Sequence, residues 1–345
     1  MKIKRIFKVL GIIIGIILLY LITMIFFPVL KVAKQPIVSE NVANAEPDCR
    51  QDVNFRVNKT LVSGCLYLPA ETDKPTPCII LTNGFCGTKD MILEKYALRF
   101  VEAGYAVLSF DYRHFGESEG EPRQLFSLPK QFEDIRAAVA FTRSRSEIDP
   151  DKIVIWGTSS SGTYGLAIAA EDKNIAAVIG QSPSLNEEEN GKKLVKRDGI
   201  GWFLSLIIHA QRDKGRSRFG LSPHTFPAVG KPGTTAMLTA PGVYDAYKKI
   251  AMNSNTFKNE VCARIMFGSH GPDLFESAKK VKCPVLFHTC ENDNINFPDA
   301  DKRVEKILGD KLTIINYPIG HFDIYFGEYF EKSINNQISF LKLHL

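Results

Sequence analysis

An alternation of short apolar or β-branched runs with longer amphipathic stretches, from about residue 51 onward, limits the fold of this chain more than any other feature. The alternation predicts strands at 53–57, 60–68, 78–82, 105–112, 152–156, 175–180, 284–289 and 311–317, with helices at about 90–103, 130–147, 160–171, 299–308 and 324–343. The first two strands lie close enough in sequence to pair as a hairpin. Because a helix separates almost all later strands, we predict an α/β fold with an eight-stranded, mostly parallel sheet flanked by helices.

One long segment, residues 181–283, interrupts this alternation between the sixth and seventh strands. It is rich in Lys, Arg, Gly and Pro and includes the stretch GIGWFLSLIIHAQRDKGRSRFGLSPH. Loops of this length without structure of their own are uncommon inside a compact domain. We therefore expect an inserted cap at about 183–280, lying over the site, within a domain that covers residues 51–345.

The run from Val9 to Phe27 contains 19 residues without a charge, enough to span about 28 Å as a helix. Four cations precede the run and two follow it. Because cations favour the cytoplasmic side, this asymmetry places the N-terminus in the cytoplasm and the rest of the chain on the extracytoplasmic side. The sequence thus predicts a membrane anchor at residues 1–34, with a single span at 9–27, followed by a linker at 35–50.

A secretory signal peptide is the alternative interpretation, since Ala43-Asn44-Ala45 resembles a cleavage site. The apolar region of a signal peptide has about 7–15 residues and is cleaved close by, whereas Ala45 lies 18 positions beyond Phe27. This comparison favours an uncleaved anchor. Whether the segment is ever removed stays open at this point.

The net charge of +5 comes from the N-terminal segment. Six of the 43 Lys and Arg residues lie before residue 35, so the remainder carries 37 cations against 38 acids, a charge of −1. A surface for nucleic acid is therefore not expected.

Seven cysteines without a C-x-x-C pair argue against a zinc ribbon or a redox dithiol. We expect no metal and no cofactor.

The predicted strand KIVIW leads into Gly157-Thr158-Ser159-Ser160-Ser161-Gly162 and then into a helix of small residues. A strand, a tight turn and a helix in this order form the nucleophile elbow. The elbow needs small residues two positions before and two after its central serine, and Gly157 and Ser161 provide them around Ser159. Centring the motif on Ser160 would put Thr158 at a tight position, so Ser159 is the predicted nucleophile. A serine-rich helix N-cap is the alternative.

A serine nucleophile needs an imidazole base that is held by a carboxylate. Asp293 follows the seventh predicted strand and His321 follows the eighth, at strand ends that face the crevice of a parallel sheet. Of the competing acids, Asp299 falls at a predicted helix start, and Asp323 is too near His321 in sequence to approach its ring from outside. We predict the triad Ser159, Asp293 and His321.

The oxyanion of an acyl-transfer intermediate needs two donors, commonly the amide after the nucleophile and one from the loop after the third strand. That loop is NGFCGTKD (83–90), and its glycines permit a close approach of the backbone. The N–H groups of Ser160 and Phe85 are the predicted donors. Cys86 has no histidine placed by sequence to activate it, so a thiol nucleophile is not expected.

Five stretches carry a family resemblance over roughly residues 51–345: LTNGFCGTKD, LSFDYRHFGESEGEPRQL, IWGTSSSG, ENDN and YPIGHFDIYFGEYFE. The chain resembles the α/β-hydrolases, and in particular the bacterial dienelactone-hydrolase-like and acetyl-xylan-esterase-like serine hydrolases. That group usually has His-Gly-Phe-Gly at the oxyanion loop, where this chain has Asn83 and Cys86 in place of the His and the second Gly. The resemblance implies an α/β-hydrolase fold and a carboxylesterase-like activity.

Together these features predict a membrane-anchored serine hydrolase that cleaves an ester, or a thioester or amide, through an acyl-enzyme. The expected partners are a small-molecule or lipid ester and the membrane, while the exact substrate and the oligomeric state do not follow from the sequence. Two alternatives stay open. The same triad would serve an acyl or peptidyl transferase, and a non-catalytic binding protein can retain the fold.

Overall fold

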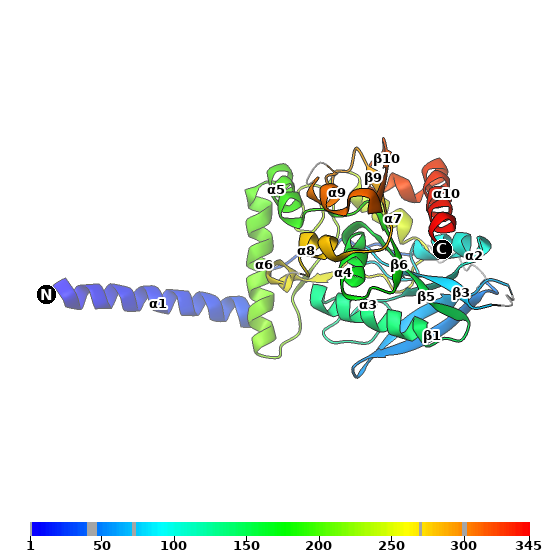
Figure 1. The fold of residues 1–345 in the computed structure, drawn as a ribbon. Helices are drawn as coiled ribbons and strands as arrows, with labels where there is room; N and C mark the ends of the chain where they lie inside the picture. Colours follow the sequence, from blue (N-terminus) through cyan, green and yellow to red (C-terminus); the bar gives the residue numbers. More distant parts are fainter. Residues whose placement is uncertain (1, 40–46, 71–73, 269–270, 299–301) are drawn as a thin grey trace.

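The computed structural model describes residues 2–39, 47–70, 74–268, 271–298 and 302–345. Within them, eight strands form one sheet in the order β1-β2-β4-β3-β5-β6-β9-β10 (Figure 1). β1 pairs antiparallel with β2 and β2 with β4, whereas all later neighbours are parallel. The strands are β1 (Arg50–Val57), β2 (Thr60–Tyr67), β3 (Thr76–Thr82), β4 (Ala106–Phe110), β5 (Ile148–Thr158), β6 (Ile175–Gln181), β9 (Val285–Cys290) and β10 (Leu312–Tyr317). The predicted opening hairpin and the mostly parallel sheet are confirmed.

The burial of the strands explains their sequence patterns. The central strands β4 and β9 are buried at every position, because helices cover both faces of a parallel sheet and leave no polar side. The edge strands β1 and β10 instead alternate or mix buried and exposed positions. The sequences of the central strands are consequently continuous apolar runs. Because β3, β5, β9 and β10 run in the same direction, their carboxyl ends lie at the same edge of the sheet.

Two helical layers sandwich the sheet. Ile79 and Trp156 pack on one side with α2 (Leu93–Glu102) and α10 (Gly327–His344). Ile80 and Ile155 pack on the other side with a second set of helices. That set comprises α3 (Leu128–Arg143), α4 (Tyr164–Glu171), α8 (Leu274–Lys280) and α9 (Arg303–Leu308). Adjacent residues on one strand therefore belong to different cores, as the alternation of strand side chains requires.

The long segment between β6 and β9 carries secondary structure of its own. It holds α5 (Glu187–Asp198), α6 (Ile200–Arg218), β7 (Thr225–Phe226), α7 (Val243–Ile250), β8 (Val261–Cys262), the 3-10 turn η2 (Ala263–Phe267) and α8. β7 and β8 pair as a separate two-stranded sheet. Helix α8 packs in the main helical layer rather than over the sheet edge, through Ala278. We call residues 183–268 the cap below; the domain boundaries themselves stay a prediction.

Helix α1 (Lys2–Phe26) projects away from the rest of the molecule (Figure 1). Its stretch Lys4–Phe26 is long and apolar enough to cross a membrane, and only 6% of its most apolar window is buried. A signal sequence near the N-terminus would have the same length and composition. The residues Ala43-Asn44-Ala45, which resemble a cleavage site, lie outside the described residues.

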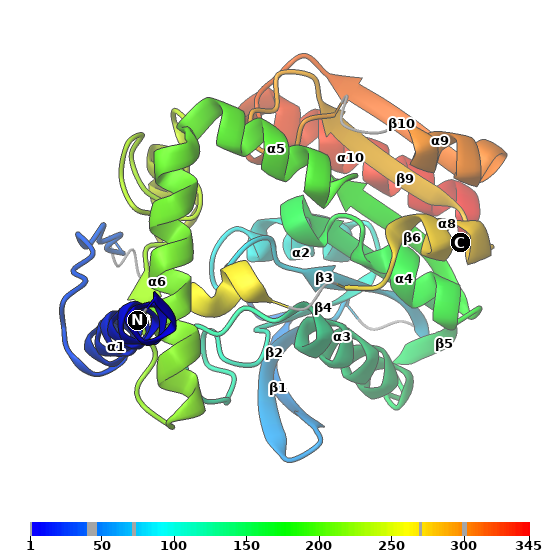
Figure 2. The same ribbon diagram turned by 90° about the vertical axis from the view of Figure 1, so that its left-hand side faces the viewer.

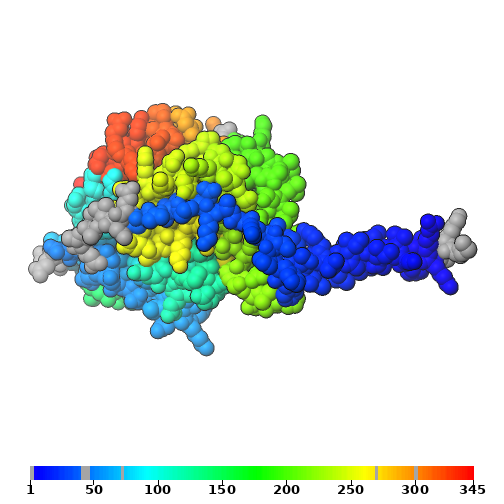
Figure 3. Space-filling view, turned by 180° about the vertical axis from the view of Figure 1, so that it is seen from behind, coloured from blue at the N-terminus to red at the C-terminus, as the bar shows by residue number. Residues whose placement is uncertain are grey.

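Residues 28–39 lie across the cap instead of hanging free (Figure 3). The hydroxyl of Tyr244 donates to the carbonyl oxygen of Pro36 over 2.7 Å, and the Asn259 amide donates to that of Gln35 over 2.7 Å. Ile37 packs in an apolar cluster of the cap. The first part of the segment between α1 and the sheet is thus attached to the cap.

Candidate active site

The turn after β5 has the geometry of a nucleophile elbow. Ser159 has a φ of 57°, a left-handed conformation that costs free energy for a side chain with a β-carbon and recurs at functional sites. A β-carbon on residue 157 would lie 2.1 Å from the carbonyl oxygen of Ser161, so only glycine fits there. The strained turn places Ser159 at the carboxyl edge of the sheet, directly ahead of α4.

Ser161 has a different environment from Ser159. Its side chain is fully buried, accepts from the amide of Thr158 over 3.1 Å, and lies 3.0 Å from the carbonyl oxygen of Thr82, to which it donates. These bonds hold the turn against β3. The hydroxyl of Ser161 therefore stabilises the elbow and does not face the crevice, which explains why serine replaces the usual glycine at this position.

His321 connects Ser159 to Asp293. The Nε2 atom of His321 lies 3.0 Å from the Oγ of Ser159, and its Nδ1 atom lies 2.6 Å from an Oδ2 of Asp293. The side chains of His321 and Asp293 are each about 1% exposed. The fold therefore brings together the three residues that sequence reasoning selected, although Ser159 lies 162 positions before His321 along the chain. Their catalytic role is still a proposal.

The acid and the imidazole are both held in place. Asp293 Oδ1 accepts from the amides of Ile295 and Asn296, each over 2.8 Å, while its Oδ2 faces His321. The ring of Phe322 stands edge-on against that of His321, with 4.8 Å between centroids. Because the carboxylate is fixed by two backbone donors, it can orient the imidazole in one direction.

The competing acids do not take the position of Asp293. Asp323 accepts from the amide of Gly320 over 2.9 Å and so stabilises the turn that carries His321. Asp299 lies outside the described residues. Among the other histidines, His288 is fully buried within β9, and burial lowers its pKa to about 3, so it is a neutral core side chain.

The loop after β3 lies beside the nucleophile. A β-carbon on Gly84 would be 3.1 Å from the Cβ of Ser159, and the loop turns back through a bond from the amide of Gly87 to the carbonyl oxygen of Gly84 over 3.2 Å. Phe85 thus sits at the tip of a tight turn next to the elbow. Its N–H group and that of Ser160 stay the predicted oxyanion donors.

Cys86 is an inert thiol. Its side chain is 3% exposed, and burial raises the pKa of the thiol well above its usual range, so the nucleophilic thiolate is disfavoured. All seven cysteines are free, in agreement with the absence of a C-x-x-C pair. A Cys nucleophile, which sequence reasoning set aside, has no support here.

Sequence reasoning missed the cap residues that complete the site. The hydroxyl of Tyr247, on α7, donates to the carbonyl oxygen of Phe85 over 2.8 Å. Tyr247 also meets the ring of Phe322, with 5.6 Å between centroids. No motif marks Tyr247, because its position depends on how the cap folds back over the sheet.

A small cavity of about 30 Å³ lies between Ser159, His321 and Tyr247. It is lined by Asn83, Gly84, Phe85, Gly87, Met91, Ile92, Thr158, Ser159, Tyr247, Ile250, His321, Phe322 and Tyr325.

Asp90 ties a second part of the cap to the oxyanion loop. Its carboxylate accepts from the hydroxyls of Thr88 and Ser254, over 2.6 and 2.7 Å. It also accepts from the hydroxyl of Thr256 and from the backbone amides of Asn255 and Thr256, over 2.9 to 3.1 Å. Burial opposes ionisation of Asp90, but these hydrogen bonds prevail and hold the pKa of its carboxyl below the ordinary 3.8. An ionised carboxylate therefore links the loop to the cap.

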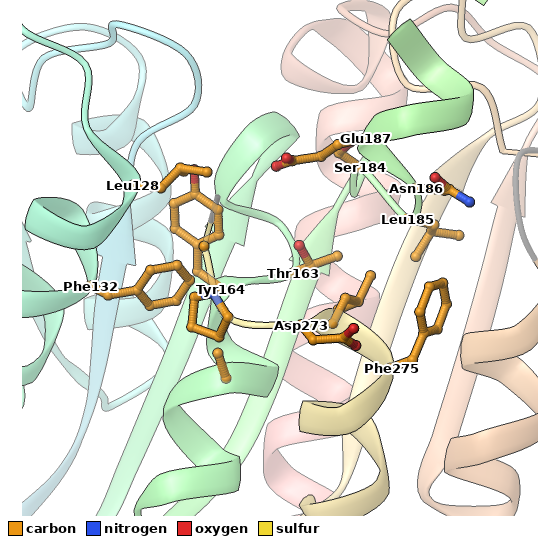
Figure 4. A pocket seen from close by; sticks show the side chains of 14 residues that line it. Leu128, Phe132, Thr163, Tyr164, Ser184, Leu185, Asn186, Glu187, Asp273 and Phe275 are labelled. Atoms are coloured by element: carbon orange, nitrogen blue, oxygen red, sulfur yellow. The ribbon is translucent and has the colours of Figure 1, made fainter. Parts of the chain in front are cut away.

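A larger cavity of about 310 Å³ opens beside α4, next to the elbow (Figure 4). Figure 4 shows Phe132 and Tyr164 on one side of it and Leu185 and Phe275 on the other. Tyr164 follows the elbow directly and donates to the Gln131 amide oxygen over 3.2 Å, which fixes its ring. The volume suits a small ligand, since ligand pockets measure about 300–1,000 Å³.

Comparison with protein families identifies the chain. A model of the family described as serine aminopeptidase, S33, matches residues 73–322, a stretch that contains the elbow, Asp293 and His321. The chain belongs to this family. It is accordingly an α/β-hydrolase of the serine hydrolase type, which confirms the resemblance to the α/β-hydrolases and the fold class predicted from sequence.

Relatives include hydrolase-fold proteins with several named activities. The quorum-quenching protein AidA of Acinetobacter baumannii is 38% identical over 299 residues, 87% of this chain and 96% of the relative. The polyketide transferase ATR5 of Stachybotrys chlorohalonatus is 29% identical, over 85% of this chain and 97% of the relative. The crystal structure of the α/β-hydrolase GrgF from Penicillium matches with a TM-score of 0.70 and 25% identity, covering 86% of this chain and 98% of that one.

Proposed function

We propose that the chain is a membrane-anchored serine hydrolase that cleaves a carboxylic ester through an acyl-enzyme. Ser159 attacks the ester carbonyl carbon while His321 Nε2 takes the hydroxyl proton, and Asp293 stabilises the imidazolium that forms. The N–H groups of Phe85 and Ser160 donate to the oxyanion. His321 then gives its proton to the leaving alcohol, and a water molecule, deprotonated by the same nitrogen, releases the acid and restores Ser159.

The observation that carries this proposal is the hydrogen-bonded series from Ser159 through His321 to Asp293, ending on two backbone amides. A non-catalytic binding protein would have no need to keep a strained serine next to a desolvated imidazole, since both cost stability. The series therefore favours an enzyme over the binding-protein alternative. A thioester is a substrate of the same chemistry, and one relative over part of the chain is named a thiohydrolase.

Acyl transfer to an alcohol or amine is the second candidate. Several relatives are named polyketide transferases, and Tyr247 of the cap packs against Phe322 beside the crevice. The acyl-enzyme would form in the same way, and an acceptor other than water would resolve it. Adding small alcohols to an ester assay distinguishes the two, because a transferase yields the new ester in place of the free acid.

A fluorophosphonate probe tests the proposal. We expect the purified full-length protein to be labelled and to hydrolyse short p-nitrophenyl esters, and Ser159→Ala to lose both while keeping its circular dichroism spectrum. Ser146→Ala, at an exposed surface serine, is the matched control and should behave as wild type. A wild-type protein that is folded yet neither labelled nor active would contradict the hydrolase proposal and support the non-catalytic binding protein.

The anchor is proposed to be α1, with the N-terminus in the cytoplasm and the catalytic domain outside. Support comes from the length and exposure of Lys4–Phe26 and from the four-to-two ratio of flanking cations. Protease added to spheroplasts should digest the domain and leave a protected N-terminal fragment. If the domain is digested only after the membrane is permeabilised, the orientation is the reverse.

A further inference from the structure

The outer face of α6 carries an apolar stripe. Ile200, Leu204 and Ile208 are 63%, 51% and 37% exposed. They recur every four residues, so they lie on one side of the helix. We call these three residues the α6 stripe. A row of exposed aliphatic side chains on one side of a helix is unusual for a surface that meets only water.

The opposite side of α6 is fixed to the cap. Asp213 is fully buried, accepts from the amide of His224 over 2.8 Å, and binds the guanidinium of Arg264 over 2.6 and 2.9 Å. Leu206 and Ala210 are buried on that side as well. The α6 stripe is thus held outward by the packing of the inner face, and α6 cannot roll to bury it.

The C-terminal end of α1 is seated on α6. Gly215 allows the contact, because a β-carbon there would lie 2.7 Å from the Cγ1 of Ile25. Arg216 donates to the carbonyl oxygen of Ile25 over 2.9 Å, and Arg212 donates to those of Met24 and Phe27, the latter over 2.6 Å. The two arginines therefore cap the last turn of α1, whose carbonyls have no partner within the helix.

The α6 stripe and the α1 contact share one face of α6. Gly215 follows Ile208 by seven residues, about two helical turns. Figure 1 shows α6 running across the base of α1, and Figure 2, which looks along α1, shows α6 extending to both sides of it. If α1 spans a bilayer, the end of that span brings α6 to the bilayer surface with the stripe facing the lipid.

We infer that α6 lies in the boundary between headgroups and acyl chains of the bilayer that α1 spans, as a second membrane contact. This inference rests on the proposed anchor. Exposed cations agree with it: Lys31 and Lys34 follow the end of α1 in sequence, and Lys214 and Arg218 lie in the C-terminal turns of α6 that contact this end, where they would meet anionic headgroups. An amphipathic helix with aliphatic residues on one side and cations beside it is the typical interfacial helix.

The consequence for the enzyme is a fixed orientation toward the membrane. Arg197, in the last turn of α5 just before α6, donates to the carbonyl oxygen of Asn294, the residue after Asp293. The segment that leads directly into α6 is thereby joined to the loop that carries Asp293. The substrate class that fits is an ester whose acyl chain partitions into the bilayer, because such a molecule reaches the cap from the lipid.

Tryptophan quenching by brominated lipid measures the contact directly. Full-length Leu204→Trp is reconstituted into vesicles of phosphatidylcholine and phosphatidylglycerol, with and without bromine on the acyl chains. Leu343→Trp is the matched control, since Leu343 is 78% exposed on α10 at the opposite end of the molecule from α6 (Figure 1). After subtraction of the parent signal, we expect the added tryptophan at 204 to be quenched at least about two-fold more than that at 343, as burial in the acyl boundary requires.

Equal quenching at the two positions would overturn the inference. Flotation of the same vesicles tests the anchor separately: protein that does not float contradicts the proposed anchor, whereas protein that floats without quenching at 204 contradicts only the docking of α6. If Leu204→Asp changes the oligomeric state of the detergent-solubilised protein and quenching is equal, the stripe is an interface between two copies.

Leu204→Asp should also lower the rate of hydrolysis of a long-chain ester in vesicles roughly ten-fold. The rate with a short soluble ester should be unaffected, since only the bilayer contact changes.

Discussion

The hydroxyl of Tyr247 donates to the carbonyl oxygen of Phe85 over 2.8 Å, so a helix of the cap holds the loop that carries a predicted oxyanion donor. Tyr247→Phe removes this bond and leaves a buried carbonyl without its partner, which costs about 1–3 kcal/mol of stability. Because the amide of Phe85 belongs to the same residue, its position should loosen. We expect kcat on a short ester to fall roughly ten-fold with little change in KM, since small misplacements weaken transition-state contacts.

Steady-state kinetics check this expectation, and fluorophosphonate labelling should persist because Ser159 and His321 are untouched. Tyr244→Phe is the control, since its hydroxyl bonds to Pro36 rather than to the oxyanion loop. A Tyr247→Phe enzyme with unchanged kcat would show that the cap does not position the loop.

Ser161→Ala separates stability from chemistry in the elbow. The variant loses a buried hydroxyl that joins the amide of Thr158 to the carbonyl oxygen of Thr82. Its free energy of unfolding should fall by about 1–3 kcal/mol, while labelling of Ser159 continues at low temperature. Thermal unfolding and probe labelling measured on one preparation test both parts. Loss of labelling with unchanged stability would move the nucleophile from Ser159 to Ser161.

Asp90 should make the attachment of the cap sensitive to acid. Its pKa is below 3.8 in the folded protein, so its contribution is fully present above the pKa of the unfolded chain and is lost as the pH falls through the folded value. Asp90→Asn should therefore destabilise the protein at neutral pH, and progressively less as the pH falls from 3.8 toward the lower pKa of the folded protein. Denaturant unfolding at several pH values gives the comparison. An equal loss of stability across the whole range would show that the charge of Asp90 does not matter.

Two deletions test how much of the N-terminal segment the domain needs. Removal of residues 1–27 keeps the bonds of Gln35 and Pro36 to the cap, so activity on a soluble ester should stay within about three-fold of the full-length enzyme. Removal of residues 1–40 also takes Ile37 from its cluster and should lower the unfolding temperature further. Thermal scans and ester assays compare the two forms. A folded but inactive 28–345 protein would indicate that α1 itself shapes the site.

The strand pattern and the elbow were predictable because they are local. Each central strand is a continuous apolar run, since both faces of it are covered, and the turn from Gly157 to Gly162 must avoid clashes over only six residues. Asp293 and His321 were reachable by the same reasoning, since side chains at the carboxyl ends of parallel strands meet at one edge of the sheet.

The cap, the bond from Tyr247 to Phe85 and the seating of α1 on α6 were decided only in three dimensions. The sequence by itself determined that an apolar helix begins the chain and that a long insertion follows β6. It did not determine that Arg212 and Arg216 of the insertion cap that helix, because these contacts join residues more than 180 positions apart. Such contacts depend on how whole helices and strands pack against one another. Packing between distant elements produces no periodic sequence pattern from which the contacting residues could be predicted.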